Sequence, residues 1–206
     1  MNYFLSFMIG YIIGSFPTAY IILKLFLDVD IRSTGSGNVG ALNSFEVSKS
    51  KMIGLSVLII DLLKGLTAVL LAKLLIGDEF IFVMISLNAA VLAHCFSPWI
   101  NFKGGRGLAT AGGGALFISI PMLLLWLLIW AISFGYPRNI HLANISASIL
   151  TAVISFTSAF LMNRFSSPHA VNNFQFSFYV GLLMLIILTK HYTPIKELYL
   201  KVNNKN

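Results

Sequence analysis

The chain has 206 residues, of which 57% are apolar and only 10% are charged, and its formal net charge is +7. Because an ordinary soluble domain carries about 25% charged residues, this composition excludes a typical water-soluble fold. The mean hydropathy of +0.85 points the same way. The basic residues lie in short loops between apolar runs, which is typical of a membrane protein and argues against a nucleic-acid-binding one.

Seven apolar segments follow one another along the chain, and each is a candidate transmembrane helix. We therefore predict an all-α, polytopic membrane protein with a single domain over residues 1–206. The first segment lacks the basic start and small-residue cleavage site of a signal peptide, so we expect it to be a retained helix. The segments cover residues 3–27, 52–76, 80–97, 107–119, 121–134, 142–162 and 174–192.

The stretch 106–134 allows two interpretations: one long tilted helix, or two short helices broken at Pro121, which removes a backbone donor. The distribution of Lys and Arg favours two helices, because with seven spans only Lys73 and Arg164 fall on the side opposite the other basic loops. With six spans Arg138 changes sides and the bias weakens. The positive-inside rule then predicts the N-terminus outside and the C-terminus in the cytoplasm.

Within the first segment, Gly10 and Gly14 have the G-x-x-x-G spacing. Small residues at this spacing let two membrane helices approach closely. We expect this pair to serve helix packing rather than chemistry.

A polar, glycine-rich loop follows the first segment, over residues 30–43. Backbone N–H groups and short hydroxyls in such loops bind phosphate. Gly35, Gly37 and Gly40 match G-x-G-x-x-G, but the dinucleotide-binding fingerprint requires a preceding strand, and an apolar helix precedes this loop. The alternative is a flexible connector, which has little need of four polar side chains among its glycines.

Asp61 and Lys64 lie in the second segment at i,i+3 spacing, on one helix face. Charges at membrane depth usually face the interior of the helix bundle and mark a functional site. A structural ion pair that fixes helix packing explains the spacing equally well.

A second glycine-rich segment, K-G-G-R-G-L-A-T over residues 103–110, leads into the fourth apolar segment. Lys103 and Arg106 flank its glycines, and the N–H groups at the start of a helix favour an anion. The alternative is that the two cations only set membrane topology.

His94 and His191 each end an apolar segment near these loops, where both are able to reach a cytoplasmic pocket. No histidine pair has the spacing of a metal site, so neither a metal nor another cofactor is expected. The chain also lacks a G-x-S-x-G nucleophile motif and a histidine followed by an acid at acyltransferase spacing. The residues alone therefore predict a cytoplasm-facing anion site for a phosphorylated ligand.

In these motifs the chain resembles the bacterial acyl-phosphate-dependent glycerol-3-phosphate acyltransferases, from Gly14 to Thr110 and more faintly beyond. Residues 35–43 are similar to the family's first cytoplasmic motif, Asp61-x-x-Lys64-Gly65 to its helix motif, and residues 102–110 to its second glycine-rich motif. The resemblance implies acyl transfer from acyl phosphate to the sn-1 hydroxyl of glycerol 3-phosphate. The products are lysophosphatidic acid and phosphate, in the first step of phospholipid synthesis. It also implies a multi-pass protein of the cell inner (cytoplasmic) membrane, with its active site facing the cytoplasm.

The resemblance assigns roles to individual residues. Ser36 and Asn38 would hold phosphate or glycerol oxygens, while Lys103 and Arg106 would neutralise phosphate and stabilise the developing oxyanion; these four are the expected catalytic residues. The expected partners are acyl phosphate, glycerol 3-phosphate and membrane lipid, without nucleic acid. The expected substrate-binding residues are Gly35, Gly37, Asn43, Asp61, Lys64, His94, Gly104, Gly105, Gly107, Thr110 and His191.

The chain departs from the family pattern at four informative positions. Arg106 replaces a usual lysine, Leu42 a threonine, Glu46 an arginine and Pro194 an asparagine. We therefore predict a diverged member of the family. Two alternatives remain: a paralogue acting on another phosphorylated acceptor, and a non-catalytic membrane protein that kept the fold. A transporter would be expected to have polar or broken helices at the midplane, whereas here the polar groups cluster near one surface.

Overall fold

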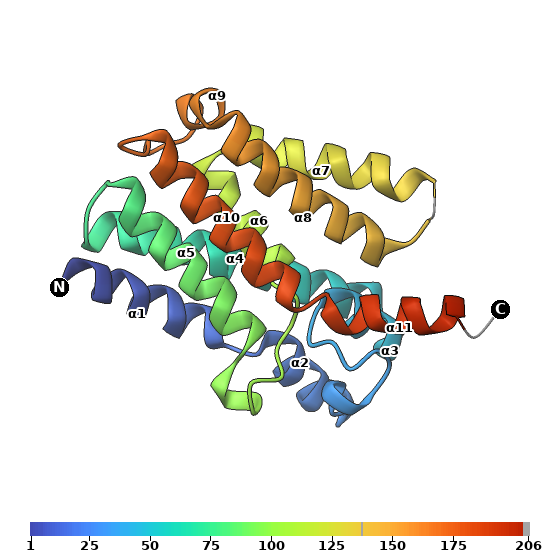
Figure 1. Cartoon of the computed structure of the whole chain (residues 1–206). Helices are drawn as coiled ribbons and strands as arrows, with labels where there is room; N and C mark the ends of the chain where they lie inside the picture. The colour runs from blue at the N-terminus through green and yellow to red at the C-terminus, as the bar shows by residue number, and fades with distance from the viewer. Residues whose placement is uncertain (137, 204–206) are drawn as a thin grey trace.

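The computed structural model describes residues 1–136 and 138–203, and these residues form helices joined by loops (Figure 1). The all-α prediction is confirmed for this part of the chain. In chain order the elements are α1 (Asn2–Ser15), α2 (Thr18–Leu27), η1 (Ile31–Ser33), α3 (Ala41–Ser48), α4 (Lys51–Leu75), α5 (Phe80–Cys95), η2 (Pro98–Ile100), α6 (Leu108–Ile118), α7 (Ile120–Gly135), α8 (Ile140–Thr157), α9 (Ala159–Arg164), α10 (Asn173–Thr189) and α11 (Tyr192–Asn203).

Four helical segments of the described chain are long and apolar enough to cross a membrane, judged by length and composition: Asn2–Leu27, Lys51–Leu75, Phe80–Ile100 and Ile140–Thr157. α6, α7 and α10 are apolar but shorter. The 11 residues of α6 extend only about 17 Å, less than the roughly 30 Å of a hydrocarbon core. The number of crossings and the orientation of the chain therefore stay predictions.

The first predicted span, 3–27, is not one helix. α1 ends at Ser15 and α2 begins at Thr18. Pro17 lies between them, and proline cannot donate the backbone hydrogen bond that a continuous helix requires. The predicted span 142–162 is likewise divided, because α8 ends at Thr157 and α9 begins at Ala159.

The ambiguous stretch 106–134 forms two helices, so the single long helix is excluded. α6 and α7 meet at Ser119, whose φ of −160° and ψ of 95° are extended. Pro121 lies in the first turn of α7, where a missing N–H costs nothing. The hydroxyl of Ser119 accepts a hydrogen bond from Met122 N–H at 3.4 Å and caps the new helix.

Glycines bring pairs of helices into backbone contact. A Cβ atom at Gly10 or Gly14 would overlap the carbonyl of Ser86 or Ala90 on α5. The predicted packing role of the G-x-x-x-G pair is thereby confirmed. α4 and α6 approach each other in the same way, because a Cβ at Gly113 would overlap the carbonyl oxygen of Leu62.

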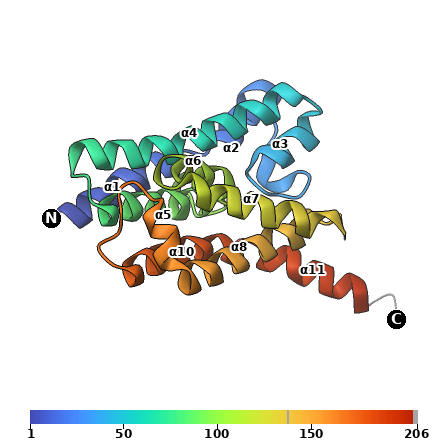
Figure 2. The same ribbon diagram turned by 90° about the horizontal axis from the view of Figure 1, so that it is seen from above.

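The helices surround a buried α5. Its Phe80, Val83 and Leu87 pack with Phe176 and Val180 of α10 in the main apolar core. Seen from above, α4 lies on one side of the molecule and α8 and α10 on the other, with α6 and α7 between them (Figure 2).

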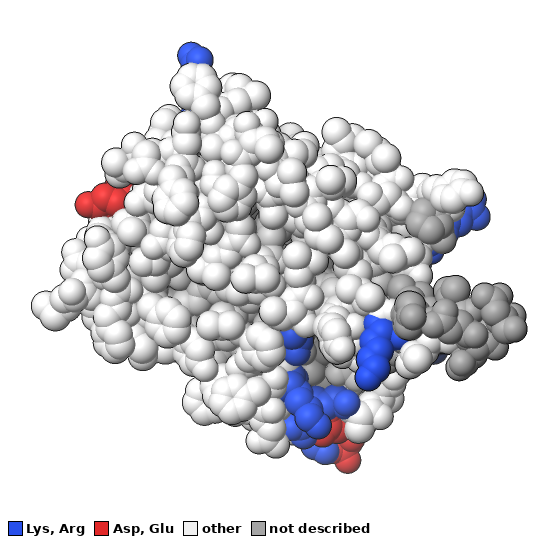
Figure 3. Space-filling view, in the orientation of Figure 1, with Lys and Arg blue, Asp and Glu red and all other residues white. Residues whose placement is uncertain are grey.

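The outer surface is mostly apolar, and its charges are gathered. On the face in Figure 3, most Lys and Arg side chains lie toward the end of the molecule where α2, α3 and α11 are found in Figure 1. Large apolar side chains such as Leu25, Leu74, Ile132 and Phe160 are exposed. An apolar surface of this extent fits contact with lipid.

We expect Gly113→Ala to destabilise the protein by about 1–3 kcal/mol, because the new methyl group would be forced against the Leu62 backbone. Gly112→Ala is the matched control, since a Cβ there lies 3.6 Å from Leu62 Cδ2, an ordinary contact. Thermal unfolding in detergent micelles measures both variants. Equal unfolding temperatures would contradict the close α4–α6 packing.

Candidate functional site

The break between α1 and α2 leaves backbone carbonyls without hydrogen-bond donors from the helix, and Lys64 of α4 supplies a donor to one of them. Lys64 Nζ donates a hydrogen bond to Phe16 O at 2.6 Å and lies 2.6 Å from Asp61 Oδ1. The Lys64 and Asp61 side chains are only 6% and 3% exposed, so each charge depends on the other. This geometry favours the structural interpretation of the pair, in which it fixes the helix break against α4.

The same break anchors the loop that follows α5. Ser97 Oγ donates to Ser15 O at 2.5 Å, and Trp99 Nε1 donates to Ser15 Oγ at 2.9 Å. The chain from α5 to the second glycine-rich segment is therefore tied to the end of α1.

His94 connects the buried ion pair with the second glycine-rich segment. Its Nδ1 lies 3.8 Å from Asp61 Oδ1, and a Cβ at Gly105 would overlap its Nε2. Gly104 N–H and Gly105 N–H donate to Cys95 O and His94 O at 3.2 and 3.1 Å. These two glycines thus allow the loop to pack on the end of α5, and their N–H groups are used within the protein.

Asn43, buried at the start of α3, organises the first glycine-rich loop. Its Oδ1 accepts from Ser36 N–H at 2.9 Å, and its Nδ2 donates to Thr34 O and Asn38 O, each at 3.0 Å. Gly35, whose φ of +62° suits glycine, packs directly against the Asn43 amide. Asn43 therefore shapes the loop from inside.

An ion pair closes the base of this loop. Arg32 Nε and Nη2 donate to the Asp30 carboxylate at 2.9 and 2.6 Å. The Arg32 guanidinium lowers the pKa of the Asp30 carboxyl to about 2, so the pair is ionised at neutral pH. Much of the Arg32 charge is thus compensated within the loop.

The two glycine-rich segments and the α10–α11 junction enclose a polar pocket of about 530 Å³. Arg106 and Lys190 both line it, and Lys190 Nζ lies 4.8 Å from the centre of the Phe96 ring, a cation–π contact. Two cations beside a glycine-rich loop suit a phosphate group. The lining residues are Gly35, Ser36, Gly37, Asn38, Phe96, Gly104, Arg106, His141, Thr189, Lys190, Thr193 and Pro194.

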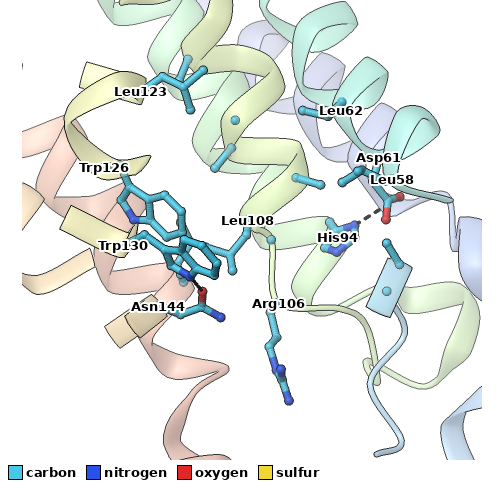
Figure 4. A pocket seen from close by; sticks show the side chains of 18 of the residues that line it. Leu58, Asp61, Leu62, His94, Arg106, Leu108, Leu123, Trp126, Trp130 and Asn144 are labelled. Atoms are coloured by element: carbon cyan, nitrogen blue, oxygen red, sulfur yellow. Dashed lines mark hydrogen bonds and ion pairs between the residues drawn. The ribbon is translucent and has the colours of Figure 1, made fainter. Parts of the chain in front are cut away.

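An apolar cavity of about 670 Å³ lies next to it, lined by α4, α6, α7, α8 and α10. Trp126 and Trp130 of α7 form one side, and Leu58 and Leu62 of α4 form the other (Figure 4). This volume lies within the range of roughly 300–1,000 Å³ found for small-molecule sites. The lining is mostly apolar and suits a hydrocarbon tail; its polar members are Asn38, Asp61, His94, Arg106 and Asn144.

Asn38 and Arg106 line both the polar pocket and the apolar cavity. Figure 4 shows the Arg106 side chain directed away from the tryptophans and the leucines. An amphiphile with its tail in the cavity and its anionic head in the polar pocket would pass this arginine at the junction of head and tail.

The structure divides the predicted site residues into three groups. Six line the polar pocket, and two of these, Asn38 and Arg106, also line the apolar cavity: Gly35, Ser36, Gly37, Asn38, Gly104 and Arg106. Three more line the apolar cavity: Asp61, His94 and Gly107. Six line neither: Asn43, Lys64, Lys103, Gly105, Thr110 and His191.

Members of the last group differ in their surroundings. Lys103 is exposed, whereas Thr110 is fully buried and its hydroxyl has no hydrogen-bond partner among the described residues. His191 is also fully buried, with Asn144 beside its ring.

Several lining residues were not predicted from the sequence. Lys190 and Thr193 lie on either side of His191, so the polar residues at the end of the last apolar segment were the signal available for them. Trp130 and Asn144 had no such signal, because residues that line an apolar cavity look like core or lipid-facing residues in a sequence.

A helical fold with an apolar exterior and adjoining polar and apolar pockets defines a membrane protein that handles an amphiphilic, anionic molecule. The sequence matches the family described as glycerol-3-phosphate acyltransferase over residues 4–201. The chain belongs to this family.

Individual relatives agree with this assignment. Glycerol-3-phosphate acyltransferase 2 of Lactobacillus johnsonii is 32% identical, covering 96% of this chain and 85% of that protein. The glycerol-3-phosphate acyltransferase of Ehrlichia canis is 32% identical over the full length of both chains.

Two crystal structures of PlsY (YgiH), an integral membrane glycerol 3-phosphate acyltransferase, are also similar. The glycerol 3-phosphate form has a TM-score of 0.80 and 29% identity, covering 98% of this chain and 94% of that one. The lysophosphatidic acid form has a TM-score of 0.77 and 28% identity, covering 98% and 93%. The predicted membrane fold and acyltransferase family are therefore confirmed.

We expect Lys64→Met to destabilise the protein by about 3–5 kcal/mol, because it leaves Asp61 as an uncompensated buried charge and Phe16 O without its donor. Lys73→Met, on the same helix, is the control. Lys73 pairs with Asp78 at 2.9 Å in a partly exposed site, so its loss should cost at most about 1 kcal/mol. Thermal unfolding in micelles compares them, and equal losses would argue against the buried brace.

Proposed function

We propose that this protein transfers an acyl group from acyl phosphate to the sn-1 hydroxyl of glycerol 3-phosphate, forming lysophosphatidic acid and inorganic phosphate. The polar pocket and the apolar cavity share Asn38 and Arg106, and this shared lining is the main support for the proposal. The acyl chain occupies the apolar cavity, and the phosphate groups occupy the polar pocket. The reacting carbonyl then lies at Arg106.

The sn-1 hydroxyl oxygen attacks the carbonyl carbon of the acyl phosphate. The new C–O bond forms, the bond from the carbonyl carbon to the phosphate oxygen breaks, and phosphate leaves with the electron pair. A phosphate oxygen of a substrate accepts the hydroxyl proton, since neither of the familiar acyl-transfer motifs occurs in the sequence. The donor is already activated, so catalysis consists chiefly of positioning and charge stabilisation.

Arg106 stabilises the charge that develops on the carbonyl and phosphate oxygens, because it lines both pockets. Ser36 and Asn38 bind phosphate or glycerol oxygens from the first loop, and Lys190 adds a cation from the α10–α11 junction. Lys103 is exposed outside both pockets, so we assign it the attraction of anionic substrates from solution. Asn43, Asp61 and Lys64 hold the loops and helices in place.

Glu46 bears on the alternative of a different phosphorylated acceptor. It is exposed on α3 and lines neither pocket. Its negative charge therefore does not face phosphate groups bound in the polar pocket. This favours glycerol 3-phosphate, the acceptor used by the family.

We further propose that the chain acts as one domain of the cell inner membrane, with the polar pocket facing the cytoplasm. Residues from Gly35 to Pro194 contribute to the polar pocket, so the chain is needed almost end to end. The gathering of Lys and Arg at the end near α2, α3 and α11 supports a cytoplasmic location of that end (Figure 3).

Arg106→Ala should lower kcat by about 10²–10³-fold with palmitoyl phosphate and glycerol 3-phosphate, the loss found when one oxyanion-stabilising donor is removed. Lys103→Ala should instead raise KM for glycerol 3-phosphate, and the effect should fade at high ionic strength, as expected for screened attraction. Product formation is followed by mass spectrometry with protein in micelles. An active Arg106→Ala variant would contradict the assigned role, and a folded wild type that forms no product would overturn the function.

Ser36→Cys should react with a membrane-impermeant thiol reagent only from the cytoplasmic side of the membrane. Cys95 is buried and should not interfere. Glu79→Cys is the matched control, because the 25 residues of α4 separate its loop from α3 by about 37 Å. It should react only from the opposite side. Labelling of Ser36→Cys from outside would overturn the orientation.

A further inference from the structure

Three polar side chains form an unbroken hydrogen-bonded series at the edge of the apolar cavity. Trp130 Nε1 donates to Asn144 Oδ1 at 2.8 Å (Figure 4), and Asn144 Nδ2 lies 3.3 Å from His191 Nε2. His191 Nδ1 lies 2.9 Å from Ile187 O. Because a carbonyl oxygen only accepts, Nδ1 carries the hydrogen and Nε2 is left to accept from the Asn144 amide. Each donor therefore meets an acceptor from α7 through α8 to the end of α10.

The two ends of this series lie at different pockets. Trp130 and Asn144 line the apolar cavity. His191 lines neither pocket, but Lys190 directly before it and Thr193 two residues after it both line the polar pocket. Two hydrogen bonds thus connect the Trp130 ring with His191, the residue directly after Lys190.

The series is held where its bonds are costly to break. Asn144 and His191 are 4% and 0% exposed, so neither can exchange its partner for water without moving. α7 packs chiefly on α8. The hydrogen bond from Trp130 to Asn144 is therefore an important link between α7 and the rest of the protein.

We propose that Trp130, Asn144 and His191 are positioning residues that couple the apolar cavity to the polar pocket. The hydrogen-bonded series aligns the acyl chain beside Trp130 with the acceptor held by Lys190. It therefore influences both acyl-chain preference and glycerol 3-phosphate binding. The inference rests on the proposed function.

The test uses the full-length protein in micelles with acyl phosphates of 12, 14 and 16 carbons. Trp130→Phe keeps an aromatic ring but removes the donor. Asn144→Leu removes both bonds while keeping the number and branching of the side-chain heavy atoms. Each should raise KM for glycerol 3-phosphate by about two- to tenfold, the value of one or two hydrogen bonds, and should flatten the dependence of kcat/KM on chain length. The double variant should match Asn144→Leu alone, because both substitutions interrupt one series.

Trp126→Phe is the matched control. Its indole lines the same cavity and its Nε1 lies 3.4 Å from Ser148 Oγ, which donates to the backbone oxygen of Asn144 at 2.8 Å. This contact does not involve the Asn144 side-chain amide that meets His191. It should alter the chain-length preference and leave KM for glycerol 3-phosphate unchanged. Trp130→Phe keeps an aromatic ring on α7 and Trp126→Phe loses the same volume, so the test stands even if Asn144→Leu does not fold.

The inference is overturned if Trp130→Phe lowers only the unfolding temperature and leaves both kinetic parameters as in wild type. It is also overturned if Trp126→Phe raises KM for glycerol 3-phosphate equally, since the effect would then come from cavity packing. A wild type without acyltransferase activity would instead defeat the proposed function, so the two failures are distinguishable.

Discussion

Lys64 of α4 holds the break between α1 and α2 in place through its contacts with Phe16 O and the buried Asp61 carboxylate. Pro17 breaks the first helix, and the carbonyls freed at the break need hydrogen-bond donors. Lys64 supplies one, while Ser97 bonds the carbonyl of Ser15 and brings the loop after α5 to the same point. This junction therefore fixes the start of the loop that leads from α5 to the second glycine-rich segment.

The site is built by two sets of residues: those that shape the loops and those that line the pockets. Asn43 shapes the first glycine-rich loop through hydrogen bonds to its side-chain amide, and Gly104 lets the second glycine-rich segment bond to the end of α5. The loops shaped in this way place Ser36, Asn38 and Arg106 in the lining of the pockets. Many glycine N–H groups that suggested phosphate binding in the sequence are thus occupied by the protein, and side chains and cations provide much of what remains for the ligand.

Periodicity and charge sufficed for the helical class, the membrane character and the two-helix form of 106–134, because Pro121 and the basic loops act locally. The motifs were enough to find six residues of the polar pocket. They could not separate Asn43, which organises a loop, from Asn38, which lines both pockets, since that distinction depends on the fold of the loop. Lys190 and Trp130 were not predicted for a related reason: their place in the site arises from helices that are distant in the sequence and meet only in the fold.

In the proposed reaction the sn-1 hydroxyl attacks an acyl carbonyl held at Arg106. Glycerol 3-phosphate labelled with ¹⁸O at the sn-1 oxygen, supplied together with palmitoyl phosphate, tests this attack when the products are analysed by mass spectrometry. We expect equal amounts of inorganic phosphate and lysophosphatidic acid, with the label in the ester oxygen of the lysophosphatidic acid. Free fatty acid with a doubly phosphorylated glycerol, or phosphate release without labelled lysophosphatidic acid, would contradict it.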